Sequence, residues 1–386
     1  MTMDTIKINV KPPYQVYIGR NIVEKLPDLI KEAAIDTFHR DMPVFIVTDR
    51  NVSSYHLKST ASTLKRYGFK VHDAVFKQGE RLKSRRNLYK LFGLLVKQGQ
   101  TRDSVIIGLG GGVIGDFSGF AASIYMRGCY FVQMPTTLLA QVDSSVGGKV
   151  GINLKEGKNL IGSFFNPLFV LTDIDRLQTL PEREFTCGLA EIIKYGLIFN
   201  KGLFEKISAF FCGALSDKQS ISNSEVKQML LNDTDFLHSI IMKSVKIKGE
   251  IVASDEREND LRMILNFGHT FGHAVEMLTN YKRFLHGEAV LLGMKIASEL
   301  SLVCNMIDAQ ENMKIRTLLD QFEIPSVKGI SAKAVHSQIS RDKKKRVGKI
   351  HYILLKKIGY ALWETDIKKN TVLECIEKVL ADHIRK

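Results

Sequence analysis

The feature that most constrains the fold of this chain is an apolar strand that runs directly into a glycine loop and a helix. Val105–Leu109 is fully apolar, the loop Gly110–Gly115 has the spacing GxGxxG, and Asp116–Ser123 has a helical pattern. Glycines let backbone N–H groups approach a phosphate at a helix N-terminus. The segment therefore predicts a pyrophosphate site, although a tight strand-to-helix turn without a ligand would use the same residues.

Strands and helices alternate through the first half of the chain, which indicates a mainly parallel sheet covered by helices. The pattern changes near Pro181, and helical periodicity dominates from Glu184 to Leu319. We expect an α/β domain over residues 1–181 and a mostly α-helical domain over residues 182–386. The strands predicted in the first domain include Val44–Thr48, Lys70–Val75, Val105–Leu109, Tyr130–Met134 and Phe169–Leu171.

The glycine loop departs from the standard dinucleotide fingerprint in one respect. That fingerprint expects an acidic residue about 20 residues downstream, where this chain has Met134–Thr137. Asp49 lies upstream, directly after the strand Val44–Thr48, and Asn51 follows it. A carboxylate there could accept ribose hydroxyls, so a dinucleotide site in a non-standard arrangement is predicted. The alternative is an ordinary turn residue at a strand end.

Histidines and carboxylates in the second half have the spacing of a metal site. His269 and His273 are four residues apart, so they share one face of a predicted helix. Two histidines and a carboxylate with one open position are typical of catalytic zinc. Spacing alone selects this pair and leaves open which of Glu191, His286 and Glu288 completes the set. The alternative is that each histidine is an ordinary polar residue on its helix.

Lysines stand beside glycines in two segments that we predict to be loops. Lys149 follows two glycines, and Lys158 lies between Gly157 and Asn159. Further basic residues flank the acidic segment 255–258, and another basic cluster is 341–345. Flexible glycines next to lysine suit an anionic ligand. Solvated surface lysines are the alternative.

Composition excludes several classes of protein. The formal net charge is +14, which is compatible with nucleic-acid binding, but no aromatic–basic surface or known binding motif is visible. No apolar run approaches the roughly 18 residues of a membrane span, and the N-terminus lacks the apolar region of a signal peptide. The five cysteines form no CxxC pair. We expect a cytoplasmic protein with neither nucleic acid nor membrane as a partner.

Several longer segments stand out when they are taken together and in order. They are LGGGVIGDFSGFAAS (109–123), YMRG (125–128), PTTLLAQVDSSVGGKVGIN (135–153), GKNLIGSF (157–164), LPEREFTCGLAEIIKYGLI (180–198), DERE (255–258), LNFGHTFGHAVE (265–276) and HGEAVLLGM (286–294). Together they resemble the 3-dehydroquinate synthases of the sugar phosphate cyclase superfamily, over roughly residues 40 to 365. The resemblance implies a Rossmann-like N-terminal domain, a helical C-terminal domain, an active site between them and a homodimer.

The resemblance also implies site residues. Its metal ligands correspond to Glu191, His269 and His286, which replaces His273 of the spacing argument; His273 matches a substrate-side histidine instead. The implied NAD contacts are Asp49, Asn51, Glu80, Lys83, Gly111, Gly112, Val113, Ile114, Gly115, Asp116, Thr136, Thr137, Asp143, Lys149, Lys158, Arg176, Thr179 and Leu180. The implied substrate contacts are Lys149, Asn159, Lys194, Lys248, Arg262, Asn266, His273, Lys344 or an adjacent lysine, and Arg127 from a neighbouring subunit.

The activity implied is that of a phosphate-eliminating lyase of aromatic amino acid biosynthesis in the shikimate pathway. It would use NAD and Zn²⁺ or Co²⁺ to convert 3-deoxy-D-arabino-heptulosonate 7-phosphate to 3-dehydroquinate and phosphate. The implied steps are transient oxidation, elimination, re-reduction, ring opening and aldol closure. A sister cyclase and an iron- or zinc-dependent alcohol or glycerol dehydrogenase are the alternatives. Arg262, Asn266 and His273 favour 3-dehydroquinate synthase over these alternatives, because a guanidinium gives a substrate carboxylate two donors.

Overall fold

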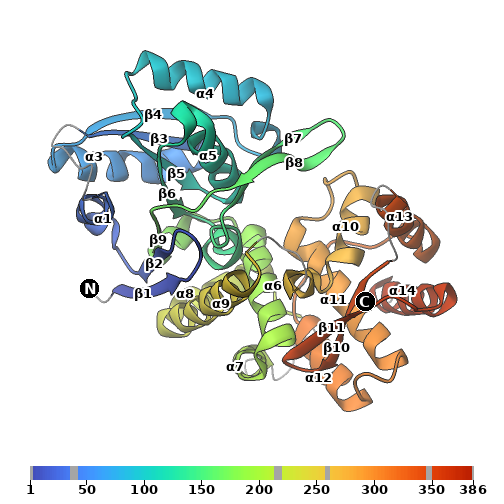
Figure 1. The fold of residues 1–386 in the computed structure, drawn as a ribbon. Helices are drawn as coiled ribbons and strands as arrows, with labels where there is room; N and C mark the ends of the chain where they lie inside the picture. The colour runs from blue at the N-terminus through green and yellow to red at the C-terminus, as the bar shows by residue number, and fades with distance from the viewer. Residues whose placement is uncertain (1–2, 35–41, 213–219, 257–260, 345–349, 385–386) are drawn as a thin grey trace. The chain divides into compact units, whose positions relative to one another are not determined.

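The computed structural model describes residues 3–34, 42–212, 220–256, 261–344 and 350–384 (Figure 1). Contacts divide the chain into two compact units. One comprises Met1–Leu180 with Ile241–Arg257, and the other Pro181–Ile240 with Glu258–Lys386. The domain boundary at residue 181 stays a prediction, because a grouping by contacts does not test which segment folds as a domain.

The first unit is built on a seven-stranded sheet in the order β1-β2-β9-β6-β5-β3-β4. β1 pairs antiparallel with β2, and every other pair is parallel. β3 and β5 are almost wholly buried, as expected for parallel strands covered on both faces. The strands are β1 (Met3–Ile8), β2 (Tyr14–Gly19), β3 (Pro43–Asp49), β4 (Lys70–Phe76), β5 (Val105–Gly110), β6 (Tyr130–Pro135) and β9 (Phe169–Asp173).

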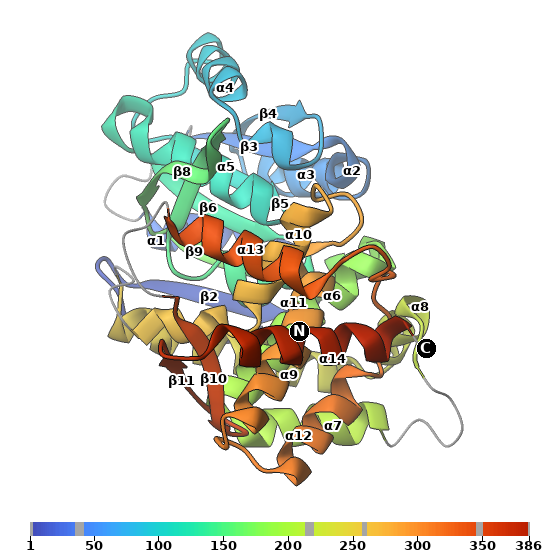
Figure 2. The same cartoon turned by 90° about the vertical axis from the view of Figure 1, so that its right-hand side faces the viewer.

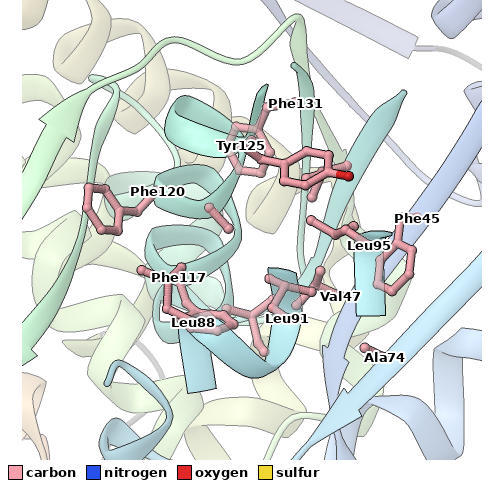
Figure 3. Packing of buried hydrophobic residues seen from close by; sticks show 14 of the residues in the cluster. Phe45, Val47, Ala74, Leu88, Leu91, Leu95, Phe117, Phe120, Tyr125 and Phe131 are labelled. Atoms are coloured by element: carbon pink, nitrogen blue, oxygen red, sulfur yellow. The ribbon is translucent and has the colours of Figure 1, made fainter. Parts of the chain in front are cut away.

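Helices cover both faces of this sheet. On one face, α4 and α5 pack on the strands through a cluster that includes Leu88, Leu91, Phe117 and Phe131 (Figure 3). On the other face, α1 and α3 pack through residues such as Leu26 and Leu64. The helices of this unit are α1 (Leu26–Ala33), α2 (Arg50–Val52), α3 (Lys58–Arg66), α4 (Arg85–Lys97), α5 (Gly112–Ile124) and the Ile241–Ser254 part of α9 (Thr234–Ser254).

The strand order places the glycine loop at a topological switch point. The parallel strands β3, β4, β5, β6 and β9 lie in the spatial order β4-β3-β5-β6-β9. After β3 the chain adds β4 on one side of that strand, and it then crosses over to add β5 on the other side. Ligands of doubly wound sheets bind beyond the carboxyl ends of the strands at such a point. Asp49 ends β3 and Gly110 ends β5, so both predicted nucleotide segments lie there.

The second unit is mostly helical, with the small hairpin β10 (Tyr352–Lys357) and β11 (Tyr360–Glu364). Helix α11 contacts α6, α10, α12, α14 and β10, and α13 packs against both α10 and α14 (Figure 2). The predicted fold class, an α/β domain followed by a mostly helical one, is confirmed. The helices are α6 (Glu182–Phe199), α7 (Lys201–Cys212), α8 (Asn223–Asn232), α10 (His269–Leu278), α11 (His286–Val303), α12 (Ala309–Leu319), α13 (Ala332–Lys344) and α14 (Lys369–Ile384).

The prediction of two lysine-bearing loops at Lys149 and Lys158 was wrong. These residues lie on the strands of an antiparallel hairpin, β7 (Lys149–Leu154) and β8 (Gly157–Phe164). Gly151 and Gly162 are paired across it, and a Cβ at Gly162 would lie 2.3 Å from the carbonyl oxygen of Val150. The glycines therefore allow close backbone approach within a hairpin rather than loop flexibility.

No helix among the described residues is both long and apolar enough to cross a membrane.

Candidate functional site

Three potential metal ligands from three helices meet in the second unit. Glu191 lies within α6, and His269 and His286 are the first residues of α10 and α11. One ligand atom from each lies within 4.8 Å of the others. His269 Nε2 is 3.4 Å and His286 Nε2 is 3.8 Å from Glu191 Oε1. Ligand atoms around tetrahedral zinc are about 3.4 Å apart, given bonds of roughly 2.0–2.1 Å, so the cluster needs little adjustment to hold one.

Close helix packing creates this cluster. A Cβ at Gly287, next to His286, would lie 2.3 Å from Cα of Cys187, so α11 begins almost in backbone contact with α6. A Cβ at Gly272 would lie 2.9 Å from the carbonyl oxygen of Ala289, which brings α10 equally close to α11. Only glycine permits both approaches, and the motifs around the ligands thus have a packing role.

Glu288, which the spacing argument left open as a ligand, has a different role. Its carboxylate accepts two hydrogen bonds from Arg183, at 2.7 and 2.8 Å, and one from the backbone N–H of Leu285. Arg183 also donates to the carbonyl oxygen of Arg283. The bidentate pair fastens the start of α6 to the start of α11 and so holds the elements that carry Glu191 and His286.

The buried carboxylate of Glu191 fits a cation. Glu191 is 1% exposed, and neither of its oxygens accepts a hydrogen bond from the described residues, although Lys194 Nζ is in ion-pair contact with Oε2. A buried carboxylate costs several kcal/mol unless charges or hydrogen bonds compensate it. A divalent ion between Glu191 and the two imidazoles would supply that compensation.

The two imidazoles differ in their surroundings. Burial, and then the neighbouring charges of Lys194 and the other histidines, lower the pKa of His269 well below its usual value. Its Nδ1 lies 3.1 Å from the carbonyl oxygen of Phe267. Since a carbonyl only accepts, Nδ1 carries the hydrogen and Nε2 offers its lone pair toward Glu191. This is the neutral form that binds metals.

His286 makes a different contact. Burial acts to lower its pKa, but a hydrogen bond with Glu276 and the charges of Glu191 and Glu276 outweigh burial and raise it. Its Nδ1 lies 3.4 Å from Glu276 Oε2. His273, Glu276 and His286 thus form a second cluster with the spacing of a metal site. Sequence reasoning missed Glu276, although His269, His273 and Glu276 follow the i, i+4, i+7 spacing of one helix face.

Two glycines of the loop in the first unit lie against side chains with which a Cβ would collide. A Cβ at Gly111 would lie 2.9 Å from Cγ2 of Thr137, and one at Gly112 would lie 2.8 Å from Oγ of Ser144. Gly112 begins the thirteen-residue helix α5, whose first N–H groups lack helical partners. Asp49 Oδ1 caps α2 by accepting from the N–H groups of Asn51 and Val52. The residues fit a pyrophosphate at the helix and a ribose at Asp49 Oδ2.

A polar cluster lies beside the loop. Lys83, 3% exposed, contacts Asp116 Oδ2 at 2.6 Å and donates to Oδ1 of Asn159. Burial raises the pKa of Asp116 to about 6, and the charge of Lys83 opposes this rise. Asn153, which the sequence analysis did not select, joins the cluster by donating to Glu80 and accepting from the N–H of Asn159. The structure therefore brings four predicted residues together.

The remaining predicted residues lie as follows. Lys248 pairs with Asp143 at 2.7 Å, and buried Arg176 donates to Thr60. Oγ1 of Thr179 lies 2.8 Å from Nε2 of His56. Val113 and Ile114 belong to the first turn of α5, and Gly115 follows them in the same helix. The buried residues are Thr136, Leu180, Lys194 and Arg262; the exposed ones are Arg127, Lys149, Asn266 and His273; the side chain of Lys344 lies outside the described residues.

Comparison with known sequences identifies the family. The profile of the 3-dehydroquinate synthase N-terminal domain matches residues 73–187, and that of the C-terminal domain matches residues 188–345. A 3-dehydroquinate synthase of Thermoanaerobacter pseudethanolicus is 42% identical over 97% of this chain and 100% of its own length. The chain belongs to the 3-dehydroquinate synthase family. It is accordingly an enzyme of the 3-dehydroquinate synthase type.

Solved structures share the fold of this 3-dehydroquinate synthase family member. One is the 2-epi-5-epi-valiolone synthase ValA of Streptomyces hygroscopicus subsp. jinggangensis with NAD⁺ and Zn²⁺ bound, with a TM-score of 0.81, 24% identity and coverage of 96% of this chain and 97% of that one. Another is a 2-deoxy-scyllo-inosose synthase complexed with carbaglucose-6-phosphate, NAD⁺ and Co²⁺, with a TM-score of 0.77, 22% identity and coverage of 98% and 99%.

The contact between α6 and α11 can be tested with a pair of glycine substitutions. Gly287→Ala should destabilise the protein by roughly 1–3 kcal/mol, because its methyl group collides with the backbone of Cys187, and it should weaken Zn²⁺ binding. Gly93→Ala is the control: this glycine lies within α4 with open space at Cβ, so it should stabilise by about 0.5–1 kcal/mol. Urea denaturation and zinc titration measure both. Wild-type stability and zinc affinity in Gly287→Ala would contradict the packing argument.

Proposed function

We propose that this enzyme converts 3-deoxy-D-arabino-heptulosonate 7-phosphate to 3-dehydroquinate and phosphate, with NAD⁺ and one Zn²⁺ or Co²⁺ ion. The observation that carries the proposal is that Glu191, His269 and His286 each place one potential ligand atom within 4.8 Å of the others. Membership of the 3-dehydroquinate synthase family supports the substrate, and the glycine loop at the switch point of the sheet supports the dinucleotide. The class is a phosphate-eliminating carbon–oxygen lyase of aromatic amino acid biosynthesis.

The two parts of the chain divide the work in this proposal. Residues 1–181 hold the nucleotide, and residues 182–386 hold the metal and most of the substrate contacts. Bound NAD⁺ would supply a reversible hydride acceptor for a substrate carbon, and a bound cation would supply polarisation of the oxygen on that carbon. Glu191, His269 and His286 would hold the cation. Glycines 111, 112 and 115 with Val113 and Ile114 would admit the pyrophosphate to the helix N-terminus.

Cationic side chains would recognise the two anionic ends of the substrate. Arg262 is buried, and its planar guanidinium offers a carboxylate two parallel donors. Asn266, at the end of the same 3-10 turn, would donate beside it. Lys149 and Asn159, on the β7–β8 hairpin, would hold the phosphate. We propose Lys344 or a neighbouring lysine as a further phosphate contact.

Lysines and one histidine would provide proton transfer and charge stabilisation. Lys194 is buried beside Glu191, so its ammonium group would stabilise negative charge that develops on the substrate oxygens. Lys248, paired with Asp143, would add a second positive charge. His273 is exposed on α10, one turn from His269, and its imidazole would move protons to and from the substrate. The departing phosphate would itself accept the proton that elimination releases.

Assay of the reaction tests this proposal directly. Incubation with the heptulosonate phosphate, NAD⁺ and Zn²⁺ should release phosphate and 3-dehydroquinate in equal amounts without net NADH. Accumulation of NADH without phosphate release would indicate an alcohol or glycerol dehydrogenase instead, and turnover only of other sugar phosphates would indicate a sister cyclase. His269→Ala should lose both zinc and turnover. Full zinc occupancy with normal turnover in that variant would refute the ligand assignment.

We also propose a cytoplasmic homodimer in which Arg127 serves the partner's site. The five cysteines are free thiols, which suits a reducing compartment. The end of α5, the 3-10 turn after it and the β7–β8 hairpin carry exposed apolar side chains: Ile124, Met126, Leu154, Leu160, Ile161 and Phe164. Ser123 and Ser163 are hydrogen-bonded at 2.9 Å, so the end of α5 lies beside the Phe164 end of β8, and exposed apolar patches are typical of interfaces. Arg127 is exposed beside Met126, and both have left-handed backbone conformations, a strain that often accompanies function.

Mixed dimers test the role of Arg127. Arg127→Ala and His269→Ala should each be nearly inactive alone, and their co-expression with two affinity tags should restore activity to the mixed dimer. Recovery is expected because one of its two sites has both an intact metal set and an arginine from the partner. A mixed dimer of Glu191→Ala and His269→Ala is the control and should stay inactive. Absence of recovery in the first pair would show that Arg127 acts within its own subunit or not at all.

A further inference from the structure

We infer that Glu276 is a positioning residue: its carboxylate holds the ring of His286 so that Nε2 faces the cation site. The inference rests on the proposed function, since it concerns how one ligand of the proposed metal site is oriented. Glu276 belongs to none of the predicted metal, cofactor or substrate contacts. It would touch neither the substrate nor the cation and would act only through His286.

The geometry around His286 assigns one carboxylate to each ring nitrogen. Nδ1 lies 3.4 Å from Glu276 Oε2, and Nε2 lies 3.8 Å from Glu191 Oε1. Both carboxylates are buried, with 6% exposure for Glu276 and 1% for Glu191. A neutral imidazole carries one hydrogen, and the nitrogen without it binds a metal. A hydrogen on Nδ1, donated to Glu276, therefore leaves the lone pair of Nε2 directed at Glu191.

His286 needs such a partner more than His269 does. The Nδ1–H of His269 is directed by the backbone carbonyl of Phe267, two residues away on the same chain segment. The side chain of His286 is 33% exposed against 11% for His269, so water can compete for its nitrogens. Ligand histidines usually donate their second N–H to a carboxylate or carbonyl, which fixes the tautomer and ring orientation. Glu276 supplies that acceptor.

The backbone between α10 and α11 is shaped to bring the two residues together. Asn280 and Tyr281 both adopt left-handed conformations, with φ of 52° and 55°. Two hydrogen bonds to the backbone carbonyl oxygen of Glu276 hold this turn. One comes from the N–H of Tyr281 at 2.8 Å and the other from Oγ1 of Thr279 at 3.2 Å. A left-handed tyrosine costs roughly 1–2 kcal/mol. The chain thus reverses beside Glu276, and α11 begins with His286 next to it.

Glu276 could instead be a metal ligand, together with His273 and His286, because this second cluster also has suitable spacing. The surroundings of the two sides of His286 favour the first arrangement. On the Nε2 side of His286, Glu191 is more deeply buried than Glu276. His269 also presents a nitrogen without hydrogen there, because its ring hydrogen is on Nδ1 and is donated to Phe267. On the Nδ1 side, His273 is exposed to solvent. The cation therefore belongs with Glu191, and Glu276 with the ring hydrogen.

Zinc titration of the metal-free full-length protein tests the inference with a graded series of variants. Glu276→Leu, of similar size but without an acceptor, should lower the Zn²⁺ affinity by about 10- to 100-fold. Glu276→Gln should lose less, because its amide oxygen still accepts from Nδ1–H. His273→Ala should bind Zn²⁺ like the wild type. In the Co²⁺-loaded proteins, the visible absorption spectrum should change in Glu276→Leu and return toward the wild-type spectrum in Glu276→Gln.

The outcomes separate this inference from the proposed metal site. His269→Ala binding Zn²⁺ like the wild type would refute the metal site. Loss of binding in His269→Ala with wild-type affinity in Glu276→Leu would overturn only the positioning role. Equal losses in Glu276→Gln, Glu276→Leu and His273→Ala would make Glu276 a ligand and likewise overturn it. If Glu276→Leu fails to fold by circular dichroism, Glu276→Gln decides: a several-fold loss of affinity is expected, and wild-type affinity with an unchanged cobalt spectrum would contradict the inference.

Discussion

The arrangement of the second unit depends on the burial of one carboxylate, that of Glu191, between two imidazoles and a lysine. An isolated charge at 1% exposure is unfavourable by several kcal/mol, so the protein must bring compensating groups to it. It does so with helix starts: His269 begins α10, His286 begins α11, and Lys194 lies one turn further along α6. The close approach of α11 to α6 at Gly287 and the Arg183–Glu288 pair hold these starts in place. The same packing that folds the helices therefore brings together side chains that could hold a divalent cation.

The first unit follows from a different constraint, the order of its parallel strands. Because the chain reverses its direction of winding around β3, the carboxyl ends of β3 and β5 open at a switch point. The segments that end these two strands carry Asp49 and the glycine loop. Asp49 thus lies at the end of the strand next to β5, although it precedes the glycine loop in sequence. The polar cluster of Lys83, Asp116 and Asn159 connects α5, the helix after the glycine loop, to the β7–β8 hairpin.

Much of this arrangement could be predicted from the sequence, because apolar periodicity and glycine spacing are local properties. The strand at Val105, the helix after it and the helical second half were predicted correctly. The choice between His273 and His286 depends on contacts between helices. Four-residue spacing places His269 and His273 on one helix face, but the imidazole that joins His269 near Glu191 is that of His286, at the start of the next helix. The hairpin of Lys149 and Lys158 was mistaken for loops because its glycines serve strand pairing. Glu276 was missed because its partner lies on the next helix.

X-ray absorption at the zinc edge of the Zn²⁺-loaded protein tests the central claim most directly, since it reports the atoms bound to the ion. The account predicts two imidazole nitrogens at about 2.0–2.1 Å, one carboxylate oxygen at about 2.0–2.2 Å and a further light atom from solvent. The spectrum of His286→Ala should retain one imidazole. Sulfur at about 2.3 Å, or an ion bound by oxygen alone, would contradict the assignment of Glu191, His269 and His286 as the ligands.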